Sequence, residues 1–234
     1  MQDILKVEKV TESIVRITMD DEQTGNSLSD QMINLLSTTI KEVSVDKLIK
    51  VIVIAGTGKI FCSGHNLKEI TAARENNDQG ESYFRDLFES CSTLMQSIVN
   101  CPKPVIAEID GIATAAGCQL VASCDLAVAS DSSSFATPGV NLGLFCSTPM
   151  VALSRNVKKK DAMKMLLTGD MIDSAEAKRI SLINDHVPSE NLSTEVMELA
   201  NKIASKSMQT VKIGKSAFYK QAELSLSEAY KYTS

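Results

Sequence analysis

The run IKVIVIA at residues 49–55 strongly restricts the possible folds of this chain. β-branched side chains dominate it, and no polar residue alternates with them after Lys50. A continuous apolar run of this length is typical of a strand that is covered on both faces. Gly56-Thr57-Gly58 then ends it as a turn. The sequence therefore predicts a buried strand within a larger core.

Around this run, the first two thirds of the chain repeat a strand–strand–helix order. From alternation and helical spacing, we expect strands at residues 4–9, 13–19, 49–55, 105–109, 125–130 and near Phe135, and helices at residues 27–43, 83–99, 118–122 and 148–155. Residues 68–81 are polar and are expected to form a mobile surface segment.

From residue 158 onward the pattern is almost wholly helical, with Pro188 as a break. We therefore predict an α/β core at residues 1–157 that holds the functional site. A helical C-terminal region at residues 158–234 would serve oligomerisation. The pattern stops at Ser234 without a cap, which leaves open that a final helix is missing.

Composition argues against several classes of protein. The net charge of -5 disfavours a dedicated nucleic-acid binder. No apolar run approaches the ~20 residues of a membrane span, and the first residues lack a secretory or Arg-rich transit signal. The six cysteines form no CxxC pair and the chain has two histidines, so we expect reduced cysteines and no metal site.

Two segments have the residue types of a reactive site. One is IFCSGHNLKE at residues 60–69, and the other is GIATAAGCQL at residues 111–120. Small residues let backbone N–H groups approach a ligand closely, and the start of a helix adds unpaired donors. Two such N–H groups converging from separate loops would form an oxyanion hole. The alternative is a pair of ordinary tight turns with close helix packing.

Four segments, in order, resemble signatures of the enoyl-CoA hydratase/isomerase (crotonase) family. IFCSGHNLKEI resembles FxxGxDLKE, and PKPVIAEIDGIATAAGCQLVASCDLAVAS resembles the family's second signature. FATPGVNLGLF resembles the third, and LLTGDMIDSAEAKRISLINDHVP the fourth. Together they cover most of residues 11–215. Residues 111–149 resemble one group within the family especially closely.

The resemblance implies an α/β fold, a crotonase-like spiral of ββα units with a helical C-terminal region. It also implies an acyl-CoA substrate, with coenzyme A as part of that substrate and no permanently bound cofactor, and a homotrimer or hexamer. A role in fatty-acid metabolism follows, in the cytoplasm of a bacterium or, after removal of a transit peptide, in the mitochondrial matrix of a eukaryote. No nucleic-acid or membrane partner is implied.

Residue by residue, the resemblance implies that the backbone N–H groups of His65 and Ala116 form the oxyanion hole. The residues that it places around the acyl-CoA are Ser63, Gly64, Asn66, Leu67, Gly117, Pro138, Leu144 and Lys215. The alternative for Lys215 is a solvated lysine on an amphipathic helix.

The chain departs from the family where hydratases have their two glutamates. These positions are Gln119 and Gly139, and neither side chain can accept a proton at neutral pH. The carboxylate of diene isomerases falls at Ser147. Three explanations stay open: an anion such as bicarbonate at Gly139, acyl-CoA binding or scaffolding without efficient chemistry, or a replacement carboxylate. Candidates for the last are Glu69, Glu75, Asp78, Glu81 and Asp86.

Other side chains and functions have weaker support. The His65 imidazole could act as a general base, but we expect it to point away from the site. His186 is expected to be structural, and Cys146 and Ser147 have no visible base to activate them. A Clp-type serine protease would need histidine and acid partners that the sequence does not show. The low aromatic content disfavours RNA binding.

Overall fold

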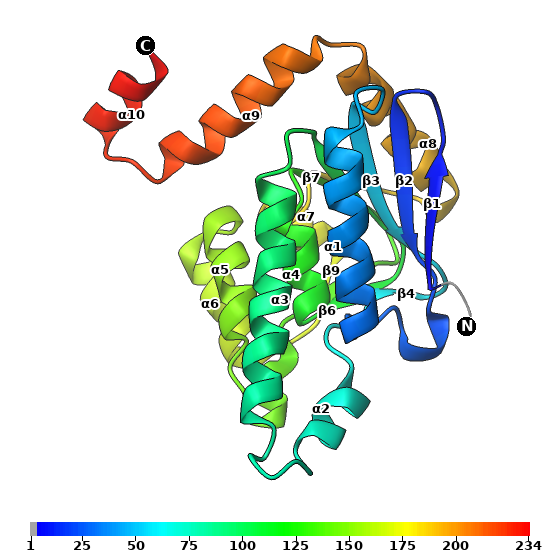
Figure 1. Ribbon diagram of the computed structural model, residues 1–234, viewed down its shortest axis with the longest axis vertical. Helices are drawn as coiled ribbons and strands as arrows, with labels where there is room; N and C mark the ends of the chain where they lie inside the picture. Colours follow the sequence, from blue (N-terminus) through cyan, green and yellow to red (C-terminus); the bar gives the residue numbers. More distant parts are fainter. Residues whose placement is uncertain (1–3) are drawn as a thin grey trace.

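The computed structural model describes residues 4–234 and has a mixed α/β architecture (Figure 1). A six-stranded sheet has the order β1-β2-β3-β5-β7-β10, and a four-stranded sheet has the order β4-β6-β8-β9. The first sheet consists of β1 Leu5–Lys9, β2 Ile14–Met19, β3 Val51–Gly56, β5 Val105–Ile109, β7 Leu126–Ser130 and β10 Asp185–Val187. The second consists of β4 Ile60–Cys62, β6 Ile112–Thr114, β8 Ser134–Ala136 and β9 Ile172–Asp173.

Neighbouring strands run parallel, except in the antiparallel pairs β1–β2 and β8–β9. The helices are α1 Asp30–Val45, α2 Leu67–Ala73, α3 Glu81–Val99, α4 Ala116–Ser123, α5 Ser147–Asn156, α6 Lys159–Thr168, α7 Ser174–Arg179, α8 Ser189–Ala204, α9 Met208–Ala222 and α10 Leu226–Thr233. Two short 3-10 helices are η1 Glu22–Thr24 and η2 Pro138–Leu142.

The β3 strand is buried on both faces, as its continuous apolar run predicts. Ile52 and Ile54 belong to the larger core cluster, which also contains side chains of α1 and α3. Val51 and Val53 belong to a second cluster, which α8 covers on the opposite face. Successive strand residues point to opposite faces, so each neighbouring pair supplies both clusters.

The predicted strands and helices of the first two thirds are all present, with small shifts at their ends. Residues 68–81 lie mostly at the surface, as expected, and they contain most of α2 and the turn that leads into α3 (Figure 1). Asp78 orders this turn, since its carboxylate accepts hydrogen bonds from the backbone N–H groups of Gly80 and Ser82 at 3.0 Å each.

The region after residue 157 is mainly helical, but two short strands interrupt it. β9 pairs with β8, and β10 joins the edge of the large sheet beside β7. The division at residue 157 therefore does not separate one sheet from another. The α9 and α10 helices extend away from the body (Figure 1), and α9 buries none of its residues. None of the helices in residues 4–234 is both long and apolar enough to cross a membrane.

Candidate functional site

The loop after β4 meets the start of α4 at Gly64. This glycine has φ +94°, and a Cβ atom on it would lie 2.9 Å from the Cβ of Ala115 and 3.2 Å from the backbone N of Ala116. The hydroxyl of Thr114 also donates to the Ser63 carbonyl at 3.0 Å, which ties the two loops together. Glycine is needed at position 64 because a side chain would push these loops apart.

Two backbone donors lie at this junction. Ala116 is the first residue of α4, and His65 directly follows Gly64. Within residues 4–234, neither backbone N–H donates a hydrogen bond to the protein. The first N–H groups of a helix have no partner inside the helix and favour negative charge. Among residues 4–234, both groups are therefore without a protein acceptor.

Ala115 holds a strained backbone conformation immediately before α4. Its φ of 52° and ψ of -118° are unusual for a residue with a side chain. The hydrogen bond from its N–H to the Ala136 carbonyl, at 3.0 Å, fixes this conformation. Such strain costs about 1–3 kcal/mol and often occurs where a fold must aim a functional group. The run of small residues predicts the loop, but not this strained residue.

Gly117 has a packing role that differs from the sequence expectation. A Cβ atom on it would lie 2.1 Å from the Cys62 carbonyl oxygen. Its missing side chain lets α4 lie against β4. The predicted contact of Gly117 with a ligand is therefore not needed to explain the glycine.

The other predicted contact residues of the first loop have structural partners. The Ser63 hydroxyl donates to the Thr24 carbonyl at 3.1 Å, and the Asn66 side chain caps α2 by accepting from the Lys68 N–H at 3.0 Å. Leu67 is 61% exposed at the start of α2. Leu67 is therefore the freest of the three to contact a ligand.

Gln119 is buried one turn into α4. Its backbone N–H bonds to the Ala115 carbonyl at 3.1 Å, and side chains on a helix lean toward its N-terminus. The side chain is thus directed toward the end of α4 that carries the Ala116 N–H. Only 4% of the residue is exposed, and its Oε1 atom has no hydrogen-bond partner among residues 4–234.

Cys146 fills the space beside Gly139. A Cβ atom on Gly139 would lie 2.7 Å from the Cys146 Sγ and 2.8 Å from the Leu144 carbonyl oxygen. Burial raises the pKa of the Cys146 thiol, which keeps it neutral. Pro138 begins η2 on one side, and Leu144 is 56% exposed on the other. Position 139 therefore has neither a carboxylate nor room for one.

The candidate replacement carboxylates have protein partners or are exposed. Glu69 accepts from the Asp30 N–H at 3.1 Å and lies 3.5 Å from the Tyr83 hydroxyl. Burial raises the pKa of Glu69. Glu81 pairs with Arg85 at 3.0 Å. Asp78 is engaged at the start of α3, whereas Glu75 and Asp86 are exposed.

The His65 imidazole packs against α3. Its ring meets Phe88 of α3 edge-on, with centroids 5.6 Å apart. Both ring nitrogens are buried without a hydrogen-bond partner. Burial lowers the pKa of His65, and the smaller effects of the Leu28 backbone and the Asp30 carboxylate oppose it. The ring is therefore neutral near pH 7 and lies against Phe88.

Lys215 binds to its own chain. Its Nζ atom donates to the Asp125 carboxylate at 2.6 Å and to the carbonyl oxygens of Ile98 and Lys103 at 3.1 and 3.0 Å. The side chain is 8% exposed, and Tyr219 also donates to Asp125 at 2.9 Å. Three acceptors match the three protons of the ammonium group. In this arrangement Lys215 anchors α9 and has no proton left for coenzyme A.

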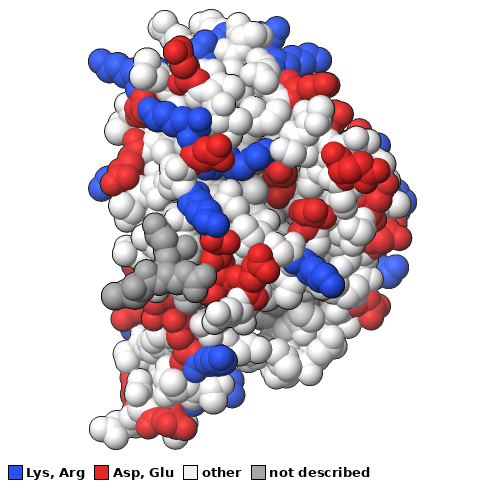
Figure 2. Space-filling view, turned by 90° about the vertical axis from the view of Figure 1, so that its right-hand side faces the viewer, with Lys and Arg blue, Asp and Glu red and all other residues white. Residues whose placement is uncertain are grey.

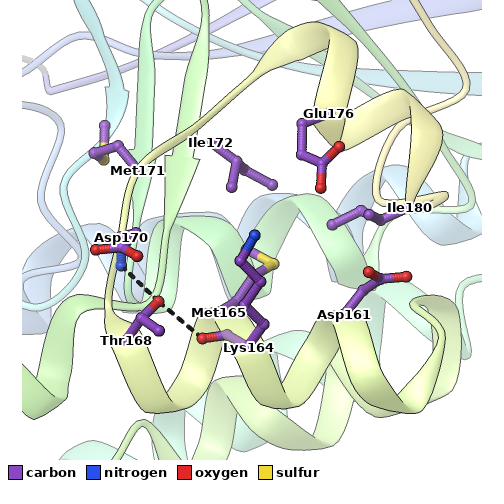
Figure 3. Close-up of a pocket in the computed structure, with 9 residues that line it drawn as sticks. All are labelled: Asp161, Lys164, Met165, Thr168, Asp170, Met171, Ile172, Glu176 and Ile180. Carbon is purple, nitrogen blue, oxygen red and sulfur yellow. Dashed lines mark hydrogen bonds between the residues drawn. The ribbon is translucent and has the colours of Figure 1, made fainter.

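A separate cavity of about 150 Å³ lies between α6, β9 and α7 (Figure 3). Its lining residues are Asp161, Lys164, Met165, Thr168, Asp170, Met171, Ile172, Glu176 and Ile180. None of the predicted site residues lines it.

Among residues 4–234, no three His, Cys, Asp or Glu side chains are grouped to hold a metal ion. On the face drawn in Figure 2, lysine and arginine side chains are scattered among acidic ones.

Comparison with known proteins identifies relatives of nearly the whole chain. The Enoyl-CoA hydratase/isomerase family model matches residues 9–234. Enoyl-CoA hydratase domain-containing protein 3, mitochondrial, of Xenopus laevis is 50% identical over 221 residues, which are 94% of this chain and 74% of that protein. The Homo sapiens protein of the same name is 48% identical over 223 residues, which are 95% of this chain and 72% of that protein.

Solved structures agree with this assignment. The crystal structure of human enoyl Coenzyme A hydratase domain-containing protein 3 has a TM-score of 0.93 and 46% identity, covering 99% of this chain and 89% of that chain. The crystal structure of enoyl-CoA hydratase from Mycobacterium smegmatis has a TM-score of 0.94 and 40% identity. The match covers 99% of this chain and 88% of that chain. These findings confirm the predicted fold class and the resemblance to one group within the family. The chain belongs to the enoyl-CoA hydratase/isomerase family.

Proposed function

We propose that this chain binds acyl-CoA thioesters and stabilises an enolate in an oxyanion hole formed by the backbone N–H groups of His65 and Ala116. The observation that carries the proposal is the close approach of Gly64 to Ala116, with both donors free of protein acceptors. A donor of this kind contributes roughly 3–4 kcal/mol to the stabilisation of a developing oxyanion.

Within the hydratase/isomerase family, the proposed role is lyase-type chemistry in fatty-acid or acyl-CoA metabolism. Neither Gln119 nor Gly139 can supply the proton transfers of an efficient hydratase. The second candidate is an acyl-CoA-binding or scaffold protein without turnover. The neutral side chains at both positions favour this candidate, whereas the free N–H groups favour an enzyme.

Calorimetry with two ligands tests the oxyanion hole. Butyryl-CoA has a thioester oxygen, and its thioether analogue S-butyl-CoA does not. We expect butyryl-CoA to bind about tenfold more tightly, because two donors stay unpaired beside the thioether. Equal affinities would refute the proposed hole. Deuterium uptake at the α-carbon of butyryl-CoA in D2O, followed by NMR, then separates an enolising enzyme from a passive binder.

We also propose that the chain forms a homotrimer or hexamer through its C-terminal region. The support is a set of exposed apolar side chains on the extended α9 and α10 helices, namely Ile213, Phe218, Leu226 and Tyr230. Exposed apolar surface of this kind marks interaction sites. Sedimentation equilibrium of the complete protein tests this, and a monomer at micromolar concentration would refute it.

For localisation, the named relatives from Xenopus laevis and Homo sapiens are mitochondrial proteins. We therefore propose the mitochondrial matrix for a eukaryotic source and the cytoplasm for a bacterial one. Fractionation of cells that express the full-length protein tests this.

A further inference from the structure

We infer that the cavity between α6, β9 and α7 binds a small free amino acid, and that this ligand increases the affinity of the protein for acyl-CoA at its separate site. The two sites are distinct, because no residue of the loops that carry Gly64 and Ala116 lines the cavity. Only the effect on acyl-CoA rests on the proposed function. The binding of the amino acid does not depend on it.

The floor of the cavity is apolar and small. Met165 is 3% exposed and Ile180 is 1% exposed, and Ile172 is partly buried beside the core. An apolar cavity with a volume of about 150 Å³ accepts a molecule of roughly the size of benzene. A short branched aliphatic group meets this limit, whereas a nucleotide or a long acyl chain exceeds it.

Two carboxylates in the lining of the cavity are already paired. Arg179 binds Asp161 at 3.0 Å and Glu176 at 2.6 Å. Its single positive charge is shared between them, and its guanidinium group supplies the hydrogen bonds that both carboxylates accept. Asp161 and Glu176 therefore form a closed network on the α7 side of the cavity.

The other two charged groups of the lining are one ammonium and one carboxylate. Lys164 and Asp170 belong to none of the ion pairs formed within residues 4–234. Figure 3 shows the Lys164 side chain rising from α6 toward Ile172, with Asp170 to one side. Lys164 can donate to a carboxylate, and Asp170 can accept from an ammonium group. A ligand with both groups next to a short aliphatic group is an α-amino acid.

Gly169 connects the Asp170 side of the cavity to the proposed acyl-CoA site. The Asp170 N–H donates to the Thr168 hydroxyl at 3.2 Å, which ties Asp170 to the end of α6. Gly169 lies between them with φ +66°, and a Cβ atom on it would lie 3.1 Å from the Cα of Pro138. Pro138 begins η2 and is one of the residues expected around acyl-CoA. A ligand held by Lys164 and Asp170 therefore restrains the segment that packs against η2.

Restraint of η2 favours acyl-CoA binding through conformational entropy. A first ligand that orders a segment removes part of the cost that a second ligand would pay to order it. Two hydrogen bonds at the end of η2 report this order. The Gly143 N–H donates to the Val140 carbonyl at 3.2 Å, and the Leu144 N–H donates to the Gly139 carbonyl at 2.9 Å. We expect both amide protons to exchange more slowly with solvent when the amino acid is bound.

The first experiment uses calorimetry of the complete protein with L-valine and three related molecules. Isovalerate lacks the ammonium group, isobutylamine lacks the carboxylate, and glycine lacks the aliphatic group. We expect valine to bind with a Kd of about 1 mM, and each of the others to bind at least about tenfold more weakly. No binding of valine at about 20 mM would refute the site. Equal affinities for valine and isobutylamine would refute the role of Lys164.

Lys164→Met and Asp170→Asn each remove one charged contact. We expect each to weaken valine binding by about tenfold, because charge-assisted hydrogen bonds are the strong ones in such a site. The matched control is Lys160→Met, which removes a lysine one turn earlier on the exposed side of α6, outside the cavity. It should change the Kd by less than about twofold. If the Lys164→Met and Lys160→Met proteins bind valine equally well, the assigned site is wrong.

A second titration measures the Kd for butyryl-CoA with and without saturating valine. We expect valine to lower this Kd by about threefold or more, and butyryl-CoA to lower the Kd for valine by the same factor, because coupling between two sites is reciprocal. An unchanged Kd, or unchanged exchange of the Gly143 and Leu144 amide protons, would refute the coupling. A protein that binds valine but not butyryl-CoA would refute the proposed function and the coupling, and would support the amino-acid site.

Discussion

The Cys146 Sγ atom lies 2.7 Å from the position that a Cβ atom on Gly139 would take. The two residues are therefore packed as one unit, in which the thiol replaces a side chain. We predict that Gly139→Ala lowers the free energy of unfolding by about 1–3 kcal/mol, because an added methyl group overpacks this contact. Urea denaturation measures the change. Adding Cys146→Ala should recover part of the loss, and strict additivity of the two changes would contradict direct packing.

Hydration of crotonyl-CoA should be very slow. Each positioned acid or base contributes about 10²–10⁴-fold to a rate, and both family positions lack one here. Adding Gln119→Glu and Gly139→Glu should raise hydration only when Cys146→Ala also makes room. Loss of crotonyl-CoA absorbance measures each variant. Turnover of hundreds per second by the wild type would show that another carboxylate acts.

Gly64→Ala should weaken acyl-CoA binding by about tenfold or more, because the new methyl group pushes the His65 loop away from Ala116. The matched control is Gly143→Ala. Gly143 has a similar positive φ of +74°, but a Cβ atom there would meet no other atom within 4 Å. Both variants place an alanine at a positive φ, so both should lose some free energy of unfolding. Only Gly64→Ala should also lose affinity for butyryl-CoA, as measured by calorimetry. Equal affinities for the two variants would count against the site.

Protein stability should depend on His65 below neutral pH. Burial depresses its pKa in the folded state below the unfolded value of about 6.5. Above that value both states are neutral, and the group contributes no pH dependence. As pH falls below it, the unfolded state binds a proton that the folded state does not bind, so stability decreases as pH decreases.

His65→Gln removes this contribution. The free energy of unfolding of the wild type, relative to the variant, should fall between pH 7.5 and 5.5, by at most about 1.4 kcal/mol per pH unit. Urea denaturation at several pH values measures the difference. A difference that stays constant over this range would mean that the imidazole is not buried.

Lys215→Met should lower the free energy of unfolding by about 3–5 kcal/mol, because it leaves the buried Asp125 carboxylate without its ion pair. The control is Lys178→Met. Lys178 pairs with Asp185 at the same 2.6 Å distance, but both side chains are about half exposed, so the loss should be below about 1 kcal/mol. Guanidinium denaturation compares the two. Similar losses of unfolding free energy in the two variants would show that burial does not strengthen the ion pair between Lys215 and Asp125.

Several features depend only on local pattern and could be predicted from the sequence. The β-branched run at residues 49–55 predicts a doubly covered strand, because only a strand buried on both faces tolerates apolar residues without alternation. The two small-residue loops predict a meeting of Gly64 with the start of a helix, because glycine and alanine permit close backbone approach. The absence of glutamate at positions 119 and 139 is likewise a fact of sequence.

The contacts of the side chains around these loops depend on how distant segments of the chain pack together. Cys146 reaches Gly139 because η2 turns the chain back on itself, and no local pattern specifies that contact. Lys215 binds Asp125, 90 positions away, and this contact anchors α9, which the expected role at coenzyme A does not predict. The His65 ring packs on Phe88, which belongs to a separate helix, α3. These contacts result from close packing between segments that are distant in the sequence. Composition and residue spacing describe local pattern only, so they do not predict such contacts.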